Sequence, residues 1–248
     1  MTAYRYLHEA LQVISSQAPD LIEVITRLRH KGEPFVCLDD TLIRTDRVAA
    51  RTERGNHSWY SGKHNAFGGN VQVITDHSGF PVWVSPVEPG STHDLIAARA
   101  HALPALYKAA SQGLRTLADK GYQGAGTGVL TPVKGTSPCP DDATYNHLHT
   151  ALRSPAERAN AMLKQFKALQ RVTLDPKAIT HITATALVII NLNKQPRRER
   201  LDVPPGAISA DMLQMTGEEL ALLLLAQRRA RRPELPEAPG MPATAPLA

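Results

Sequence analysis

The chain has 248 residues, of which 42% are hydrophobic and 21% charged, a balance that is typical of a globular protein and excludes fibrous and wholly disordered ones. No apolar run is long enough to span a bilayer, the N-terminus lacks the apolar core of a signal peptide, and two cysteines are too few for a disulfide framework. We therefore expect a cytoplasmic protein with free thiols and no membrane partner.

The net charge of +5 is distributed unevenly along the chain. Residues 1–34 carry four basic and four acidic side chains and residues 35–152 carry ten of each, whereas residues 153–200 carry ten basic and three acidic ones. This excess fits either a face that binds a polyanion or a solvated basic helix.

The first elements predicted are two helices and a strand. Apolar residues recur every three or four positions over 4–14, and a second periodic run follows Pro19-Asp20 over 21–28. The short apolar run 35–38 is typical of a buried strand, which we expect to end at Asp39-Asp40. The polar stretch 44–63 has no periodicity and predicts either a loop or a strand edge, placed where it can lie over a site.

A hairpin and a crossover helix come next. Residues 70–76 and 80–85 alternate around a turn at 77–79, and Ser91 or Thr92 can cap a helix over 94–110. Short strands are predicted over 114–117 and 128–133. The order is that of a mixed α/β sheet.

The remaining sequence predicts mainly helices. Residues 135–152 read as a linker with helical character toward its end, and Ser154, Pro155 and Glu157 have the spacing of a helix start with a capping box. An apolar helix over 178–193 is expected to pack against the sheet. Residues 201–248 predict a separate helix over 211–232 followed by a proline-rich disordered tail.

Three carboxylates occupy informative places in this order. Asp39 and Asp119 end strands, and Glu157 lies in the first turn of a later helix, so the three can converge at the carboxyl edge of the sheet. Clustered carboxylates repel one another unless cations lie among them, and Mg²⁺ prefers oxygen ligands of this kind. With a basic segment beside them, they indicate metal-dependent cleavage or transfer of nucleic-acid strands.

Each of these acids also has a structural interpretation. Asp39 and Asp119 each fit a simple turn, and Glu157 fits the capping box alone. Asp94 suits the positive end of a helix dipole, and His93 is by default an exposed or capping residue.

Six sequence blocks together resemble the motif series of the DDE superfamily endonucleases, which are transposases of bacterial insertion sequences and their Harbinger-like relatives. The match covers about residues 35–195. The blocks are Leu38-Asp39-Asp40-Thr41-Leu42-Ile43, Tyr60-Ser61-Gly62-Lys63-His64, Asn70-Val71-Gln72-Val73-Ile74, Pro89-Gly90-Ser91-Thr92-His93-Asp94, Ala118-Asp119-Lys120-Gly121-Tyr122-Gln123-Gly124 and Glu157-Arg158-x-x-x-x-Leu163-Lys164.

The resemblance implies a ribonuclease H-like α/β fold and a set of site residues. It implies Asp39, Asp119 and Glu157 as catalytic ligands of Mg²⁺ or Mn²⁺, and Asp94 as a further metal or supporting ligand. The residues implied to contact DNA are Lys63, His64, Arg158 and Lys164. The family has glycine where this chain has Asp40, so an extra carboxylate stands beside the first ligand.

The resemblance also implies a division of the chain. Residues 1–34 resemble only the last helix of the family's N-terminal DNA-binding module, which predicts a truncated helical remnant; 35–200 form the ribonuclease H-like catalytic domain; and 201–248 match nothing in the family. We expect a nucleoid-associated transposase that acts on transposon ends and target DNA as a homo-oligomer. The alternatives are a noncatalytic DNA-binding remnant and, ranked last, a resolvase or repair nuclease.

Overall fold

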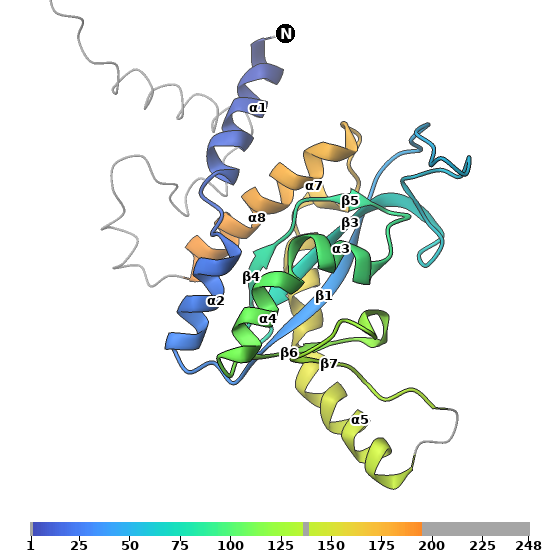
Figure 1. Ribbon diagram of the computed structural model, residues 1–248. Helices are drawn as coiled ribbons and strands as arrows, with labels where there is room; N and C mark the ends of the chain where they lie inside the picture. The colour runs from blue at the N-terminus through green and yellow to red at the C-terminus, as the bar shows by residue number, and fades with distance from the viewer. Residues whose placement is uncertain (1, 136–138, 195–248) are drawn as a thin grey trace, which may run out of the picture.

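A computed structural model describes residues 2–135 and 139–194 of the chain (Figure 1). The helix predicted over 211–232 and the proline-rich tail lie outside the described residues. In the part described, no helix has both the length and the apolar character needed to cross a membrane.

The centre of the fold is a seven-stranded mixed sheet within the described residues. Its main path runs β2-β3-β1-β6-β7, and β4 and β5 also pair with β3. Strand β1 is antiparallel to β3 and parallel to β6, which in turn is parallel to β7. The strands are β1 (Phe35–Arg44), β2 (Tyr60–Ser61), β3 (Ala66–Thr75), β4 (Pro81–Val84), β5 (Glu88–Pro89), β6 (Arg115–Ala118) and β7 (Val129–Leu130).

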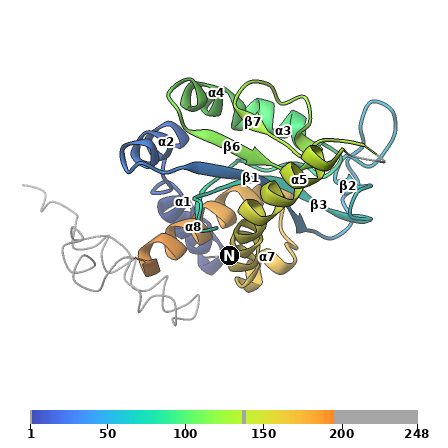
Figure 2. The ribbon, with the colours of Figure 1, turned by 90° about the horizontal axis from the view of Figure 1, so that it is seen from below.

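Helices cover both faces of this sheet (Figure 2). The α-helices described are α1 (Thr2–Ser15), α2 (Leu21–His30), α3 (Asp94–His101), α4 (Leu103–Ser111), α5 (Pro140–Arg153), α6 (Glu157–Lys164), α7 (Lys167–Gln170) and α8 (Ile179–Lys194). This arrangement confirms the predicted fold class, a mixed α/β sheet flanked by helices, and is consistent with a ribonuclease H-like fold.

Two apolar cores lie on opposite faces of the sheet because side chains of β1 and β3 alternate between them. Leu38 and Ile74 pack with α2 and α4 on one face, whereas Ile43, Val71 and Val73 pack with α6 and α8 on the other. Helix α1 packs against α8. The two N-terminal helices are therefore part of the same packed body as the sheet.

The hairpin and the helix α8 form close to where the sequence predicts them, but several boundaries differ. Strand β1 continues through Asp39-Asp40 to Arg44, because Asp40 keeps its place in the ladder opposite Gln72. The crossover helix predicted over 94–110 is interrupted at Ala102, just before Pro104, and its cap is His93 and not Ser91 or Thr92.

The region between β7 and α6 differs most from the prediction. The predicted linker contains the 14-residue helix α5, which begins with Pro140 at a position where its missing N–H is not needed. Ser154 does not cap a helix: it begins a 3₁₀ turn, Ser154–Ala156, that joins α5 to α6, and its hydroxyl donates to the Ala151 carbonyl. The predicted capping box is therefore wrong, and Glu157 is not held by it.

Candidate metal and DNA site

Neighbouring aspartates of β1 serve opposite faces of the sheet. Asp39 lies on the side of α5 and α6, where the Asn160 amide donates to Asp39 Oδ2 at 3.2 Å and Arg153 Nη2 lies 3.4 Å from Oδ1. Asp40 lies toward α3, where it accepts from Lys63 Nζ at 2.9 Å. Strand β1 thus directs the Asp39 carboxylate to one face of the sheet and the Asp40 carboxylate to the other.

Asp119 joins these two aspartates because β6 runs parallel to β1. Ala118 pairs with Leu38, so Asp119 follows β6 at the level where Asp39 follows Leu38. Asp119 caps a short 3₁₀ turn, in which its Oδ1 accepts from the Gly121 N–H at 2.8 Å. One oxygen each of Asp39, Asp40 and Asp119 lies within 4.8 Å of the others.

Burial makes this three-aspartate cluster electrostatically costly. Burial, which Arg153 only partly offsets, raises the pKa of Asp39 to about 6, and the charges of Asp40 and Asp119 add to the effect. Burial also raises the pKa of Asp40, and the charge of Asp94 contributes while Lys63 opposes. A cation among these oxygens would remove the repulsion, so the donor set fits a hard divalent ion.

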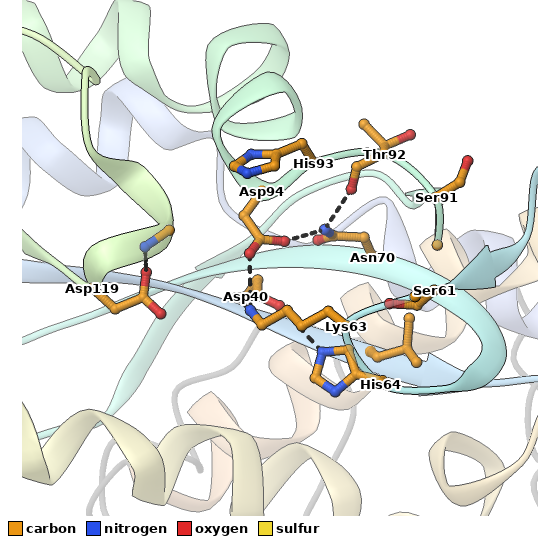
Figure 3. A pocket seen from close by; sticks show the side chains of 14 residues that line it. Asp40, Ser61, Lys63, His64, Asn70, Ser91, Thr92, His93, Asp94 and Asp119 are labelled. Atoms are coloured by element: carbon orange, nitrogen blue, oxygen red, sulfur yellow. Dashed lines mark hydrogen bonds and ion pairs between the residues drawn. The ribbon is translucent and has the colours of Figure 1, made fainter.

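Asp94 is the fourth carboxylate of the site, although it is outside the three-aspartate cluster. It begins α3, and Lys63 bridges its Oδ2 and Asp40 Oδ1 at 2.9 Å each (Figure 3). Burial lowers the pKa of Lys63, but the hydrogen bonds to Asp94 and Asp40 outweigh it and raise the pKa. The lysine is therefore a fixed positive charge between two acids.

A chain of buried hydrogen bonds holds Asp94 in place. The Tyr122 hydroxyl donates to Gln72 Oε1 at 2.8 Å, Gln72 Nε2 donates to Asn70 Oδ1 at 2.9 Å, and Asn70 Nδ2 donates to Asp94 Oδ1 at 2.8 Å. Because Tyr122 belongs to the turn that follows Asp119, this chain ties the β6 end of the site to α3.

The space between these elements forms a pocket of about 400 Å³. It is lined by Asp40, Lys63, His64, Asn70, Asp94 and Asp119, among others, as Figure 3 shows. Gly121 keeps the floor open, because a Cβ there would lie 3.0 Å from Asp119 Oδ1 and 3.2 Å from Asp94 Oδ2.

The other residues singled out by sequence lie around this centre. Glu157 begins α6 with an exposed side chain and is outside the three-aspartate cluster. Arg158 and Lys164 are exposed on the same helix. The pKa of Lys164 is lowered, because the effect of burial outweighs the charges of Asp40 and Asp39, which raise it. His64 Nε2 lies 3.9 Å from Asp40 Oδ2.

Sequence reasoning missed the parts played by Arg153, Asn160 and Asp40. Asn160 lies three positions after Glu157, so helical periodicity places it on the same side of α6, and this spacing could have found it. Arg153 ends a helix that the sequence did not clearly indicate. The sequence indicates Asp40 only as an extra carboxylate, although Asp40 is a full member of the cluster.

Comparison with known proteins assigns the chain to a family. Residues 38–191, more than half of the chain, match the family model of the DDE superfamily endonucleases. The protein belongs to this family. Searches of curated proteins and of solved structures found no match.

The matched region of this DDE superfamily endonuclease runs from β1 into α8 and contains the whole three-aspartate cluster. DDE-type nucleases use divalent metal ions and act on DNA, and the cluster supplies the acidic oxygens that such ions prefer. The family and the geometry therefore agree on a nuclease of the transposase type.

Proposed function

We propose that the protein is a transposase that cuts and joins DNA strands at transposon ends, with Asp39, Asp119 and Glu157 holding Mg²⁺ or Mn²⁺. The observation that carries the proposal is the convergence of Asp39 and Asp119 from two parallel strands in a family of DNA endonucleases. Glu157 has no capping role, and its exposed position on α6 leaves its carboxylate accessible to a ligand.

The residues of the site fit a divalent ion in two respects. Carboxylate oxygens of the proposed ligands Asp39 and Asp119 and of the neighbouring Asp40 lie within 4.8 Å of one another. The buried Asn160 Oδ1, next to Asp39, has no hydrogen-bond partner in the described part of the chain. Bound ions of this class lower the pKa of an attacking water or 3′-hydroxyl and offset charge at the phosphate. We assign Asp94 a supporting role, since it orients Lys63 beside Asp40.

The protein's own side chains would position the DNA. Arg158 and Lys164 are exposed on α6, the helix whose Asn160 contacts Asp39, so their charges can engage phosphates beside the cluster. His64 and Lys63 border the pocket from the loop between β2 and β3. We extend the proposal to a homo-oligomer on DNA that binds transposon ends and target, in the nucleoid.

Plasmid nicking tests the proposal. With Mg²⁺ or Mn²⁺, wild type should nick supercoiled plasmid, and Asp119→Ala should lower the rate by more than about 100-fold because one side of the ion site is lost. Asp141→Ala, which removes an exposed carboxylate from the first turn of α5, is the matched control and should leave the rate unchanged. Equal nicking by wild type and Asp119→Ala would reject the assignment.

A noncatalytic DNA-binding remnant is the second candidate. It is favoured by the position of Glu157 outside the three-aspartate cluster and by the Lys63 ammonium already bound to Asp40. A remnant would bind DNA without nicking it under either ion. Gain of nicking in Asp40→Gly, from an inert wild type, would support this candidate.

A further inference from the structure

The chain between β1 and β2, residues 45–59, forms an arm that projects beyond β2 at the edge of the sheet (Figures 1 and 2). We call it the β1–β2 arm. Its two sides are joined near the tip, where the Thr52 N–H donates to the Asn56 carbonyl at 2.7 Å, and Arg51 and His57 form an antiparallel bridge. The β1–β2 arm is therefore a hairpin held by its own backbone hydrogen bonds.

The basic side chains of the β1–β2 arm and of the strand end that leads into it are all arginines. Arg44 ends β1 and is exposed, and three further exposed arginines follow in the arm, Arg47, Arg51 and Arg54. In the part of the chain that the structure describes, none of the four forms a salt bridge. Guanidinium groups without a carboxylate partner are suited to phosphate, which they bind through paired N–H donors.

The acidic side chains of the β1–β2 arm do not cancel this charge. They are Asp46 and Glu53, and Asp46 is already paired with Arg171, whose Nε donates to it at 2.7 Å. The four arginines and Arg171 therefore carry five formal positive charges against two negative ones. An excess of this size on a projecting hairpin fits a polyanionic partner.

The β1–β2 arm is continuous with the three-aspartate cluster through β1. Asp40 and Arg44 lie four residues apart on this strand, so the arm begins about 14 Å from the cluster. At its base the Val172 N–H donates to the Arg44 carbonyl at 2.8 Å, which joins the arm to the segment that follows α7. Lys164 of α6 lies near enough for the charges of both Asp40 and Arg44 to act on it. Basic side chains therefore form a row from the cluster, through α6, to the arm.

The length of this row can be compared with the geometry of DNA. Successive phosphates of one strand are about 3.4 Å apart along the axis of the duplex, so 14 Å corresponds to about four base pairs. A duplex whose cut phosphate lies at the cluster would reach the base of the β1–β2 arm about four base pairs away. The tip of the arm would meet the duplex still farther from the cut.

We propose that the β1–β2 arm is a DNA-binding element that holds the phosphate backbone of the duplex about four or more base pairs from the site of cutting. Arg44, Arg47 and Arg54 contact phosphates. Arg51, whose Nη1 donates to the Gly55 carbonyl at 2.6 Å, is a positioning residue that ties the tip of the arm to its base. This inference rests on the proposed function in taking DNA as the partner, but the contacts of the arm need no metal ion.

Duplex binding in EDTA tests the inference on the full chain without metal-dependent cutting. Fluorescence anisotropy over a salt series uses a duplex of about 30 base pairs, close to three helical turns. Arg47→Ala combined with Arg54→Ala should reduce the magnitude of the slope of log K against log salt by about 2, since each phosphate contact contributes about 0.9. Arg47→Lys combined with Arg54→Lys should keep the wild-type slope, because the positive charges remain. Lys108→Ala combined with Arg115→Ala, which removes two exposed basic side chains from α4 and from the start of β6, should leave the slope unchanged.

A combined variant separates the β1–β2 arm from α6. Addition of Arg158→Ala and Lys164→Ala to the alanine variant of the arm should reduce the slope by about 4 in total, because the two elements contact different phosphates. A total reduction of only about 2 would show that they share phosphates and would overturn the placement of the arm away from the cut. Thermal unfolding of each variant confirms that it is folded.

The outcomes separate this inference from the proposed function. An unchanged slope in the folded alanine variant of the arm would overturn the inference, and the proposed function would stand if wild type nicks plasmid with Mg²⁺ or Mn²⁺. A wild type that binds DNA through the arm but does not nick under either ion would overturn the proposed function alone. A wild type that does not bind the duplex at low salt would overturn both.

Discussion

At the scale of single residues, the buried carboxylate of Asp39 lowers the stability of the folded protein when it is ionised. The fold raises its pKa from 3.8 to about 6, so the folded protein holds this proton more tightly than the unfolded chain does. The contribution of Asp39 to stability is therefore fully present below about pH 4 and is lost as the pH rises through 6. At neutral pH the ionised carboxylate destabilises the fold.

Because ionised Asp39 destabilises the fold, Asp39→Asn should stabilise the protein at neutral pH in the absence of divalent ions. At pH 7.5 the substitution should raise the free energy of unfolding by up to about 3 kcal/mol, because it removes the ionised acid, although Arg153 loses its charged partner. The gain should shrink as the pH falls from 6 to 4. Urea unfolding at several pH values measures it, and a gain independent of pH would contradict the explanation.

At the scale of elements, the turn between β3 and β4 packs closely against the 3₁₀ turn that joins α5 to α6. Gly79 has a φ of +80°, and a Cβ there would lie 1.9 Å from the Pro155 carbonyl oxygen. Gly79→Ala should therefore destabilise the protein by about 2–5 kcal/mol, from backbone strain and overpacking together. Gly113→Ala is the matched control.

Gly113 also has a positive φ, +93°, but nothing lies within 4 Å of its Cβ position. Its substitution should cost only the backbone strain, about 1–2 kcal/mol. Thermal unfolding of both variants separates the cost of backbone strain from the cost of the close contact with Pro155. Equal losses would show that the contact with Pro155 contributes nothing.

The same turn shows what local sequence can and cannot predict. Its hairpin follows from alternation and from a glycine turn, and these signals need no knowledge of the rest of the chain. The contact with Pro155 joins distant segments, so no local pattern contains it. The failed capping box at Ser154 has the same origin, since α5 continues into the 3₁₀ turn and leaves no free helix start for Ser154 to cap.

The site itself was predictable in part. The sequence predicts that Asp39 and Asp119 lie together because the carboxyl ends of neighbouring strands meet at one edge of the sheet. Adjacent aspartates favour turns, so the sequence predicts that the strand ends at Asp39-Asp40. In the structure β1 continues to Arg44, and Lys63 pairs with Asp40. That lysine lies in a loop with no periodicity, so its contact with Asp40 depends on tertiary structure that the sequence pattern does not encode.

At the scale of the whole molecule, the uneven charge should appear as salt-dependent DNA binding. Each phosphate contact contributes about −0.9 to the slope of log K against log salt. Replacement of both Arg158 and Lys164 by alanine should therefore reduce the magnitude of this slope by about 2, as measured by fluorescence anisotropy over a salt series. Lys108→Ala, on a helix that packs on the other face of the sheet, should leave the slope unchanged. An unaltered slope in the double variant would exclude α6 from the DNA-binding face.

The pairing of Leu38 with Ala118 has a consequence for the lifetime of the protein. The aspartates that follow these residues are far apart along the chain and meet only once β6 has docked beside β1. Any ion they hold is a ligand of the native state alone, so occupancy draws the equilibrium away from unfolding. Under the proposed metal-dependent function, the molecules that carry an ion are therefore also the ones that resist degradation longest, and the metal-free molecules are degraded first.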